Sequence, residues 1–170
     1  MEDFSFFDYR IAKNIGVKYG VITTVMMILY FLTMMAMGLA EKTELRAFNF
    51  ILQMIGIHLA FREYKHSHNG KIKYLKGFGV GGVTALVNTL SFALFMFIFL
   101  GSVDPELMQY IKENEPMGDY LTPFLCAVAI TMEGLFTGLL NTFILMQYEK
   151  TGHLARRKPP TKSHDIKLSH

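Results

Sequence analysis

Long runs of apolar residues, rather than an alternation of apolar and polar positions, dominate the chain. Residues 19–40 and residues 77–103 contain no charged side chain, and residues 120–148 contain one, Glu133. A helix that crosses the ~30 Å hydrocarbon core of a bilayer needs roughly 20 residues. The three runs therefore predict three transmembrane helices, over residues 19–40, 77–103 and 120–148.

A fourth, shorter apolar run covers residues 47–61. Arg46 and Arg62 bracket it, and long basic side chains can extend to the lipid headgroups. We therefore predict a further span over residues 45–63. The expected fold class is all-α, a four-helix transmembrane bundle built from residues 1–150. Residues 151–170 are charged and poor in apolar side chains, which is typical of a mobile basic tail.

The connection between the third and fourth spans carries the signals of a short helix. Asp104 can accept hydrogen bonds from the first free N–H groups of a helix, and Pro105 suits the first helical position. Pro116 and Gly118 end such a helix. We predict a short interfacial helix between helices three and four.

Basic residues flank the predicted spans unequally. Of the 17 Lys and Arg residues, fourteen lie in residues 1–18, in the connection at residues 62–76 and in the tail after residue 149. Because cytoplasmic flanks carry the excess of Lys and Arg, we expect both termini in the cytoplasm. Membrane topology and attraction to anionic lipids at that face explain the positions of these basic residues, so nucleic acid is not an expected partner.

Composition excludes several classes of protein. A chain with 51% apolar residues and a mean hydropathy of +0.28 is not disordered. The single cysteine, Cys126, excludes an intramolecular disulfide. No nucleophilic triad, phosphate-binding loop or pair of catalytic carboxylates can be assembled, so we expect neither an enzyme nor a bound cofactor.

Glu133 is the most informative polar residue, because it lies near the middle of the last predicted span. A charged side chain there costs at least ~2.5–3.5 kcal/mol if it faces lipid. At 100° per residue, one face of that helix carries Thr122, Cys126, Ala129, Glu133 and Thr137. The second and third helices carry similar faces: Asn49, Gln53, Gly56 and Ala60 on one, and Gly77, Gly81, Thr84 and Asn88 on the other. We expect these faces to meet inside the bundle, with a candidate polar membrane site formed by Glu133, Asn49, Gln53, Asn88 and Thr137.

Three interpretations of Glu133 follow. It relays protons or cations at the membrane midplane; or it is a neutral carboxyl that donates to Asn49, Gln53 or Asn88 and holds the bundle together; or it meets a charged residue of another subunit. A relay usually involves several titratable groups. Only His58 is available, and it lies about 130° or more from the face that carries Asn49, which weakens the relay.

Glycines mark close helix contacts. Gly134 and Gly138 form a GxxxG pattern in an apolar segment, and Gly77 and Gly81 lie at the same spacing in the third helix. Packing within the bundle is the favoured interpretation, with dimerisation as the alternative. Residues 77–82 also match G-x-G-x-x-G, but no strand signal precedes them and no acidic residue follows at about 20 positions, so we do not expect a dinucleotide site.

A metal site is not expected either. His66 and His68, with Glu63 nearby, are potential ligands in a basic connection, but nothing in the sequence supplies groups that would orient them.

The segment around the second connection resembles a known family. Tyr64-Lys65 near the end of helix two, the turn at Asn69-Gly70 and Gly77-Phe78 at the start of a glycine-bearing helix are similar to small four-helix integral membrane proteins. These proteins form the domain-of-unknown-function family numbered forty-one ninety-nine, found chiefly in Bacteroidota. The resemblance covers roughly residues 10–150 and implies a bacterial inner-membrane location. It implies no activity, cofactor or catalytic residue.

We therefore expect a non-enzymatic accessory or assembly subunit of a larger inner-membrane complex, with other membrane subunits or a second copy as partners. The alternative is a small proton- or cation-coupled transporter, dimeric in its simplest form, that uses Glu133.

Overall fold

The computed structural model describes residues 3–39, 47–67, 74–114 and 117–155. Nearly all of these residues are helical and none forms a β-strand, which confirms the all-α prediction for the part of the chain described. The elements follow in chain order: α1 (Asp3–Ala36), α2 (Ala47–Ser67), α3 (Tyr74–Ile98), the π-helical turn η2 (Phe99–Val103), α4 (Pro105–Asn114), the 3-10 turn η3 (Gly118–Tyr120) and α5 (Pro123–Ala155).

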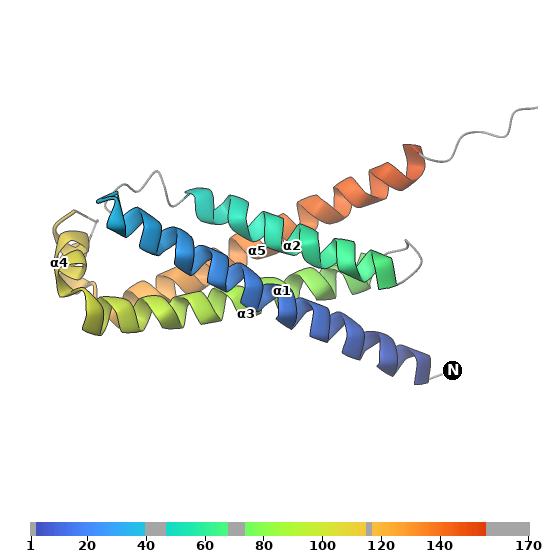
Figure 1. Cartoon of the computed structure of the whole chain (residues 1–170), viewed down its shortest axis with the longest axis horizontal. Coiled ribbons are helices and arrows are strands. Elements are labelled where there is room, and N and C mark those ends of the chain that lie inside the picture. The colour runs from blue at the N-terminus through green and yellow to red at the C-terminus, as the bar shows by residue number, and fades with distance from the viewer. Residues whose placement is uncertain (1–2, 40–46, 68–73, 115–116, 156–170) are drawn as a thin grey trace, which may run out of the picture.

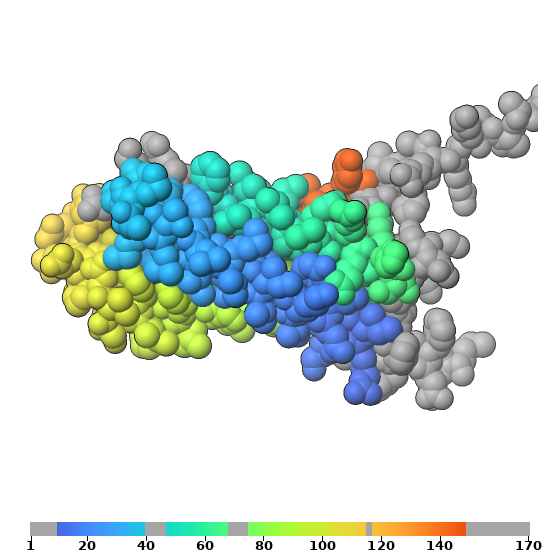
Figure 2. Space-filling view, in the orientation of Figure 1, coloured from blue at the N-terminus to red at the C-terminus, as the bar shows by residue number. Residues whose placement is uncertain are grey.

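The four long helices form an elongated bundle in which α3 is central. Helix α3 contacts α1, α2 and α5, whereas α1 packs mainly on α2 and α3. The N-terminal end of α1 and the C-terminal end of α5 lie at the same end of the bundle and diverge there, with α4 at the opposite end (Figure 1). On the face seen in Figure 2, α1 runs across the bundle with α2 and α3 on either side of it.

Three helical segments are long and apolar enough to cross a membrane: Arg10–Ala36, Leu75–Val103 and Pro123–Tyr148. The chain is a multi-pass membrane protein. The expected fourth span over residues 45–63 is not among these segments, although α2 has 21 residues. Length is therefore not the reason. Helix α2 is too polar, because Asn49, Gln53 and His58 interrupt its apolar run and Arg62 and Glu63 follow.

Helix α1 begins earlier and ends sooner than the predicted span of residues 19–40. It has 34 residues, about 51 Å at 1.5 Å per residue, so it is longer than the bilayer core is thick. Its end is set by Gly38, whose φ of 69° favours glycine. There the N–H of Gly38 donates to the Met35 carbonyl and the N–H of Leu39 to the Met34 carbonyl, the pair of bonds that closes a Schellman motif.

The short helix expected between the third and fourth spans is α4. Asp104 caps it, since its Oδ1 accepts a hydrogen bond from the Leu107 N–H at 3.0 Å. Met108 and Ile111 on its inner face are buried. They pack in an apolar cluster with Phe92, Met96 and Leu100 of α3 and η2, so α4 closes one end of the bundle.

A second apolar cluster lies nearer the end of the bundle where α5 finishes. Ile57, Phe61 and Tyr64 of α2 form its largest buried part, packed with Val80 of α3 and Leu145 of α5. The expected domain boundary at residue 150 does not interrupt α5, which continues to Ala155. The remainder of the tail predicted to be mobile, residues 156–170, lies outside the described residues.

Candidate functional site

A layer of polar side chains separates the two apolar clusters. Every long helix contributes to it, and eight of its members are buried: Thr23, Thr24, Gln53, Thr84, Asn88, Thr89, Asn141 and Thr142. Most of the threonines satisfy their hydroxyl groups within their own helix, as Thr84 does by donating to the Val80 carbonyl at 2.8 Å. The amide side chains, by contrast, link different helices.

Gln53 of α2 is the centre of this polar layer and is 3% exposed. Its Oε1 accepts a hydrogen bond from the Thr137 hydroxyl of α5 at 3.1 Å. Its Nε2 donates to the Gly134 carbonyl of α5 at 3.1 Å and to the Thr89 hydroxyl of α3 at 3.4 Å. One side chain therefore joins three helices.

The asparagines are less completely satisfied. Asn88 Oδ1 accepts from the Thr24 hydroxyl at 3.4 Å, and Asn141 Nδ2 donates to the Phe50 carbonyl at 3.3 Å. Three buried amide atoms have no hydrogen-bond partner among the described residues: Asn49 Oδ1, Asn88 Nδ2 and Asn141 Oδ1. Buried polar atoms of this kind usually have a protein or water partner, so the polar layer has unused hydrogen-bonding capacity.

Two of the three faces predicted to meet inside the bundle do so. On α2, Gln53, Gly56 and Ala60 are buried and Asn49 is partly buried. On α3, Gly77, Gly81, Thr84 and Asn88 are all buried. His58 is exposed on another side of α2, away from the polar layer.

The predicted inward face of α5 is wrong. Thr122, Ala129 and Glu133 are exposed, and only Cys126 and Thr137 on that face are partly buried. The side of α5 that packs inward carries Gly134, Gly138, Asn141 and Thr142 instead, centred roughly 100–140° from Glu133 at 100° per residue. The structure therefore brings Gln53 and Thr137 together, places Asn49 and Asn88 inside and leaves Glu133 on the outer surface.

Close approach at glycine explains this rotation of α5. A Cβ at Gly134 would lie 2.7 Å from Thr89 Cγ2, and one at Gly138 would collide with the Cβ of Ala85. A Cβ at Gly81 of α3 would likewise collide with Thr142. The contact area gained when Gly134 and Gly138 pack against α3 turns α5 so that Glu133 points away from α3.

The Glu133 carboxylate has no hydrogen-bond or ion-pair partner within the described part of the chain. It lies ten residues after Pro123, the first residue of the candidate span, about 15 Å along the helix axis. A lipid-facing charge at this depth costs at least ~2.5–3.5 kcal/mol. An unpaired carboxyl group on the outer surface of a span is therefore unfavourable for this fold as a single chain in lipid.

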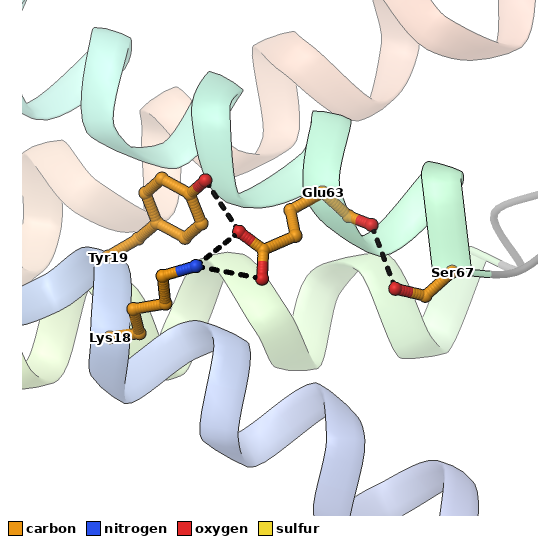
Figure 3. A network of polar contacts seen from close by, with 4 residues as sticks. All are labelled: Lys18, Tyr19, Glu63 and Ser67. Carbon is orange, nitrogen blue, oxygen red and sulfur yellow. Dashed lines mark hydrogen bonds and ion pairs between the residues drawn. The ribbon is translucent and has the colours of Figure 1, made fainter.

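A polar cluster between α1 and α2 was not predicted from the sequence (Figure 3). Lys18 Nζ contacts both carboxylate oxygens of Glu63, at 2.8 and 3.0 Å, and the Tyr19 hydroxyl donates to Glu63 Oε2 at 2.7 Å. The Lys18 ammonium, followed by the Tyr19 hydroxyl, holds the pKa of the Glu63 carboxyl below its ordinary value of 4.5. The sequence did contain a signal for this cluster: Lys18 and Glu63 have opposite charges and lie in two flanks that are both expected on the cytoplasmic side. As a basic residue of the flank at residues 1–18, Lys18 indicated only the orientation of the chain.

Close contacts at two glycines of α1 were not predicted from the sequence either. A Cβ at Gly16 or Gly20 would lie within 3 Å of Val83 or Val87 of α3, respectively. Their own GxxxG spacing could have indicated this contact.

The potential metal ligands that the structure describes, Glu63 and His66, do not form a metal site. Glu63 is bound to Lys18 and Tyr19, His66 lies in the last turn of α2, and His68 is outside the described residues. Across the described segments, no group of three His, Cys, Asp or Glu side chains could hold a metal ion.

Comparison with protein families gives a match over residues 18–148 to the family described as Protein of unknown function (DUF4199). The chain belongs to the DUF4199 family. This confirms the resemblance seen at the second connection. The matched region of this DUF4199 protein includes the whole polar layer, Glu133 and the Lys18–Tyr19–Glu63 cluster. No curated protein and no solved structure matches the chain.

Proposed function

We propose that this DUF4199 protein is a non-enzymatic accessory or assembly subunit of a larger complex in the bacterial inner membrane. The observation that carries the proposal is the exposed Glu133 in the middle of α5. Lipid does not stabilise a carboxyl group at that depth, whereas a neighbouring membrane subunit can do so through a hydrogen bond or an ion pair.

In the proposed topology α2 crosses the membrane as a fourth, polar span, and both termini are cytoplasmic. Helix α2 is suited to this because Asn49 and Gln53 face the bundle interior rather than lipid. An even number of crossings agrees with the ends of α1 and α5 lying at one end of the bundle (Figure 1). The excess of Lys and Arg in the sequence segments that flank these helix ends favours the cytoplasm and anionic lipids there.

The second candidate is a small proton- or cation-coupled transporter. The unpaired amide atoms of Asn49, Asn88 and Asn141 favour it, because a transport path through a bundle needs polar groups that are free to bind. Glu133 does not lie with them. A transporter of this geometry would use the polar layer, with Glu133 as a contact to a second subunit.

Extraction in mild detergent, followed by sizing and mass spectrometry of the co-purified chains, tests the leading proposal. We expect the chain to migrate with at least one different membrane protein in a fixed ratio. Migration alone or only as a homodimer would contradict it. Proton-dependent uptake into proteoliposomes by the wild-type chain, abolished by Asn88→Leu with the fold intact, would favour the transporter instead.

A further inference from the structure

We infer that the outer face of α5 around Glu133 binds a transmembrane helix of a different chain, and that this helix carries a Lys or Arg side chain at the depth of Glu133. This inference rests on the proposed role as a subunit of a complex and names the contact. The Glu133 face is defined by five exposed residues within about 60° of one direction: Ala129, Glu133, Phe136, Leu140 and Ile144.

The chain itself offers Glu133 no partner in the described structure. The nearest polar side chain on the helix is that of Thr137, whose hydroxyl donates to Gln53 Oε1 and to the backbone carbonyls of Glu133 and Gly134. That hydroxyl has one proton, already shared among these three acceptors, so the carboxylate of Glu133 cannot rely on it.

Charge complementarity favours a different chain over a second copy. The candidate spans contain no Lys, Arg or His at the depth of Glu133, because residues 19–36, 77–103 and 134–148 are free of basic side chains. The candidate spans of a second copy in the same orientation would therefore present only another carboxyl group there. A basic side chain on a partner helix neutralises Glu133 and leaves no exposed charge at the midplane.

His58 does not alter this conclusion. Gln53 lies level with Thr137, to which it is hydrogen-bonded. Because α2 and α5 run in the same direction (Figure 1), His58 lies about 7.5 Å beyond that level and Glu133 about 6 Å before it, at 1.5 Å per residue. The offset of about 13.5 Å along the helix axes is too large for a salt bridge in a second copy of the same orientation.

Site-specific photo-cross-linking of the full chain in its native membrane tests the inference. A photoreactive phenylalanine replaces Leu140 on the Glu133 face, and in a matched variant it replaces Leu139. These neighbours have similar exposure, 41% and 45%, but Leu139 lies about 120° from Glu133. We expect at least tenfold more cross-linking from position 140 than from position 139, to a helix of another protein that contains Lys or Arg at the level of Glu133.

Charge exchange completes the test. Glu133→Lys should reduce the cross-link at least tenfold, and replacement of the partner's basic residue by Glu in the same cells should restore it. An adduct of twice the chain mass, adducts with lipid only, or a cross-linked helix without a basic residue would each overturn the inference. If cross-links to another protein arise equally from position 139, this interface is wrong although the subunit role stands. If the chain also purifies alone, both fail.

Discussion

The side-chain oxygen of Gln53 accepts a hydrogen bond from the Thr137 hydroxyl at 3.1 Å, and this contact joins α2 to α5 in the middle of the bundle. Thr137 lies one turn after Glu133, yet Thr137 is partly buried against α2 whereas Glu133 is exposed. Helix α2 is the most polar of the four long helices, and Gln53 buries much of that polarity against α3 and α5. The same contact therefore anchors α2 on α5.

Replacing Gln53 by Leu should destabilise the bundle. The variant loses three hydrogen bonds and leaves the hydroxyl groups of Thr89 and Thr137 with fewer partners. Interhelical hydrogen bonds in membranes average ~0.6 kcal/mol, with a maximum of ~1.7 kcal/mol, so we expect a loss of about 1–2 kcal/mol in the free energy of unfolding. Unfolding of the purified protein in mixed micelles measures it. Ile55→Leu at an exposed position of α2 is the control and should change the free energy little. Equal stability of all three proteins would show that Gln53 does not anchor α2.

Two glycine substitutions should differ in their effect on stability. Gly138→Ala places a methyl group against Ala85 Cβ and the Gln53 amide, and crowding of this kind costs about 1–3 kcal/mol. Gly82→Ala meets no atom within 4 Å and should be neutral or stabilising by roughly 0.4–1 kcal/mol, because alanine restricts the unfolded chain. Thermal unfolding in one detergent compares the two. A destabilised Gly82→Ala beside an unaffected Gly138→Ala would contradict the packing of α5 on α3.

The apolar spans and the inward faces of α2 and α3 could be predicted from the sequence for a physical reason. Lipid demands long uncharged runs, and small or polar residues recur on one side of a helix that packs within a bundle. Asn49 and Gln53 on one helix and Thr84 and Asn88 on another follow that rule. The polarity that makes the inward face of α2 recognisable also removes α2 from the set of strongly apolar spans.

The rotation of α5 could not be predicted in the same way. Its sequence carries two adjacent faces of small and polar residues, one with Glu133 and one with Gly134 and Gly138. Which of them faces inward depends on the surface of α3 at Ala85 and Thr89, about 50 positions earlier in the chain. For a single chain, the cost of exposing a carboxylate to lipid favours an inward position of the face with Glu133. Helix packing instead favours an inward position of the face with Gly134 and Gly138.

The Glu63 carboxylate should make stability depend on pH. Lys18 and Tyr19 hold its pKa in the folded protein below the ordinary value of 4.5. A lowered pKa contributes stability that is complete above 4.5 and is lost as pH falls through the folded value. We expect wild type to unfold at a higher temperature than Glu63→Gln at pH 7, with the difference disappearing as the pH is lowered below 4.5. In a Lys18→Gln background the difference at pH 7 should shrink, and a difference independent of both pH and Lys18 would contradict the cluster.

Cysteine labelling should decide whether α2 crosses the membrane. In a Cys126→Ala background, single cysteines replace Ser67 at the end of α2 and Gln109 on α4, both exposed positions. With four crossings and a cytoplasmic N-terminus, a membrane-impermeant maleimide should reach position 109 from the outer side of the inner membrane. Position 67 should react only from the cytoplasmic side.

The same two positions give a distinct pattern if α2 lies on the outer side without crossing. Position 67 would then react from the outer side and position 109 from the cytoplasmic side, because α3 would cross in the reverse direction. A tag at the N-terminus, tested by protease in inverted vesicles, supplies the reference orientation. Since Gln53 and Asn49 of α2 are held against α3 and α5 inside the bundle, we expect the first pattern. The second pattern would contradict the packing of α2 in the polar layer, because α3 and α5 would still cross the membrane while α2 lay outside it.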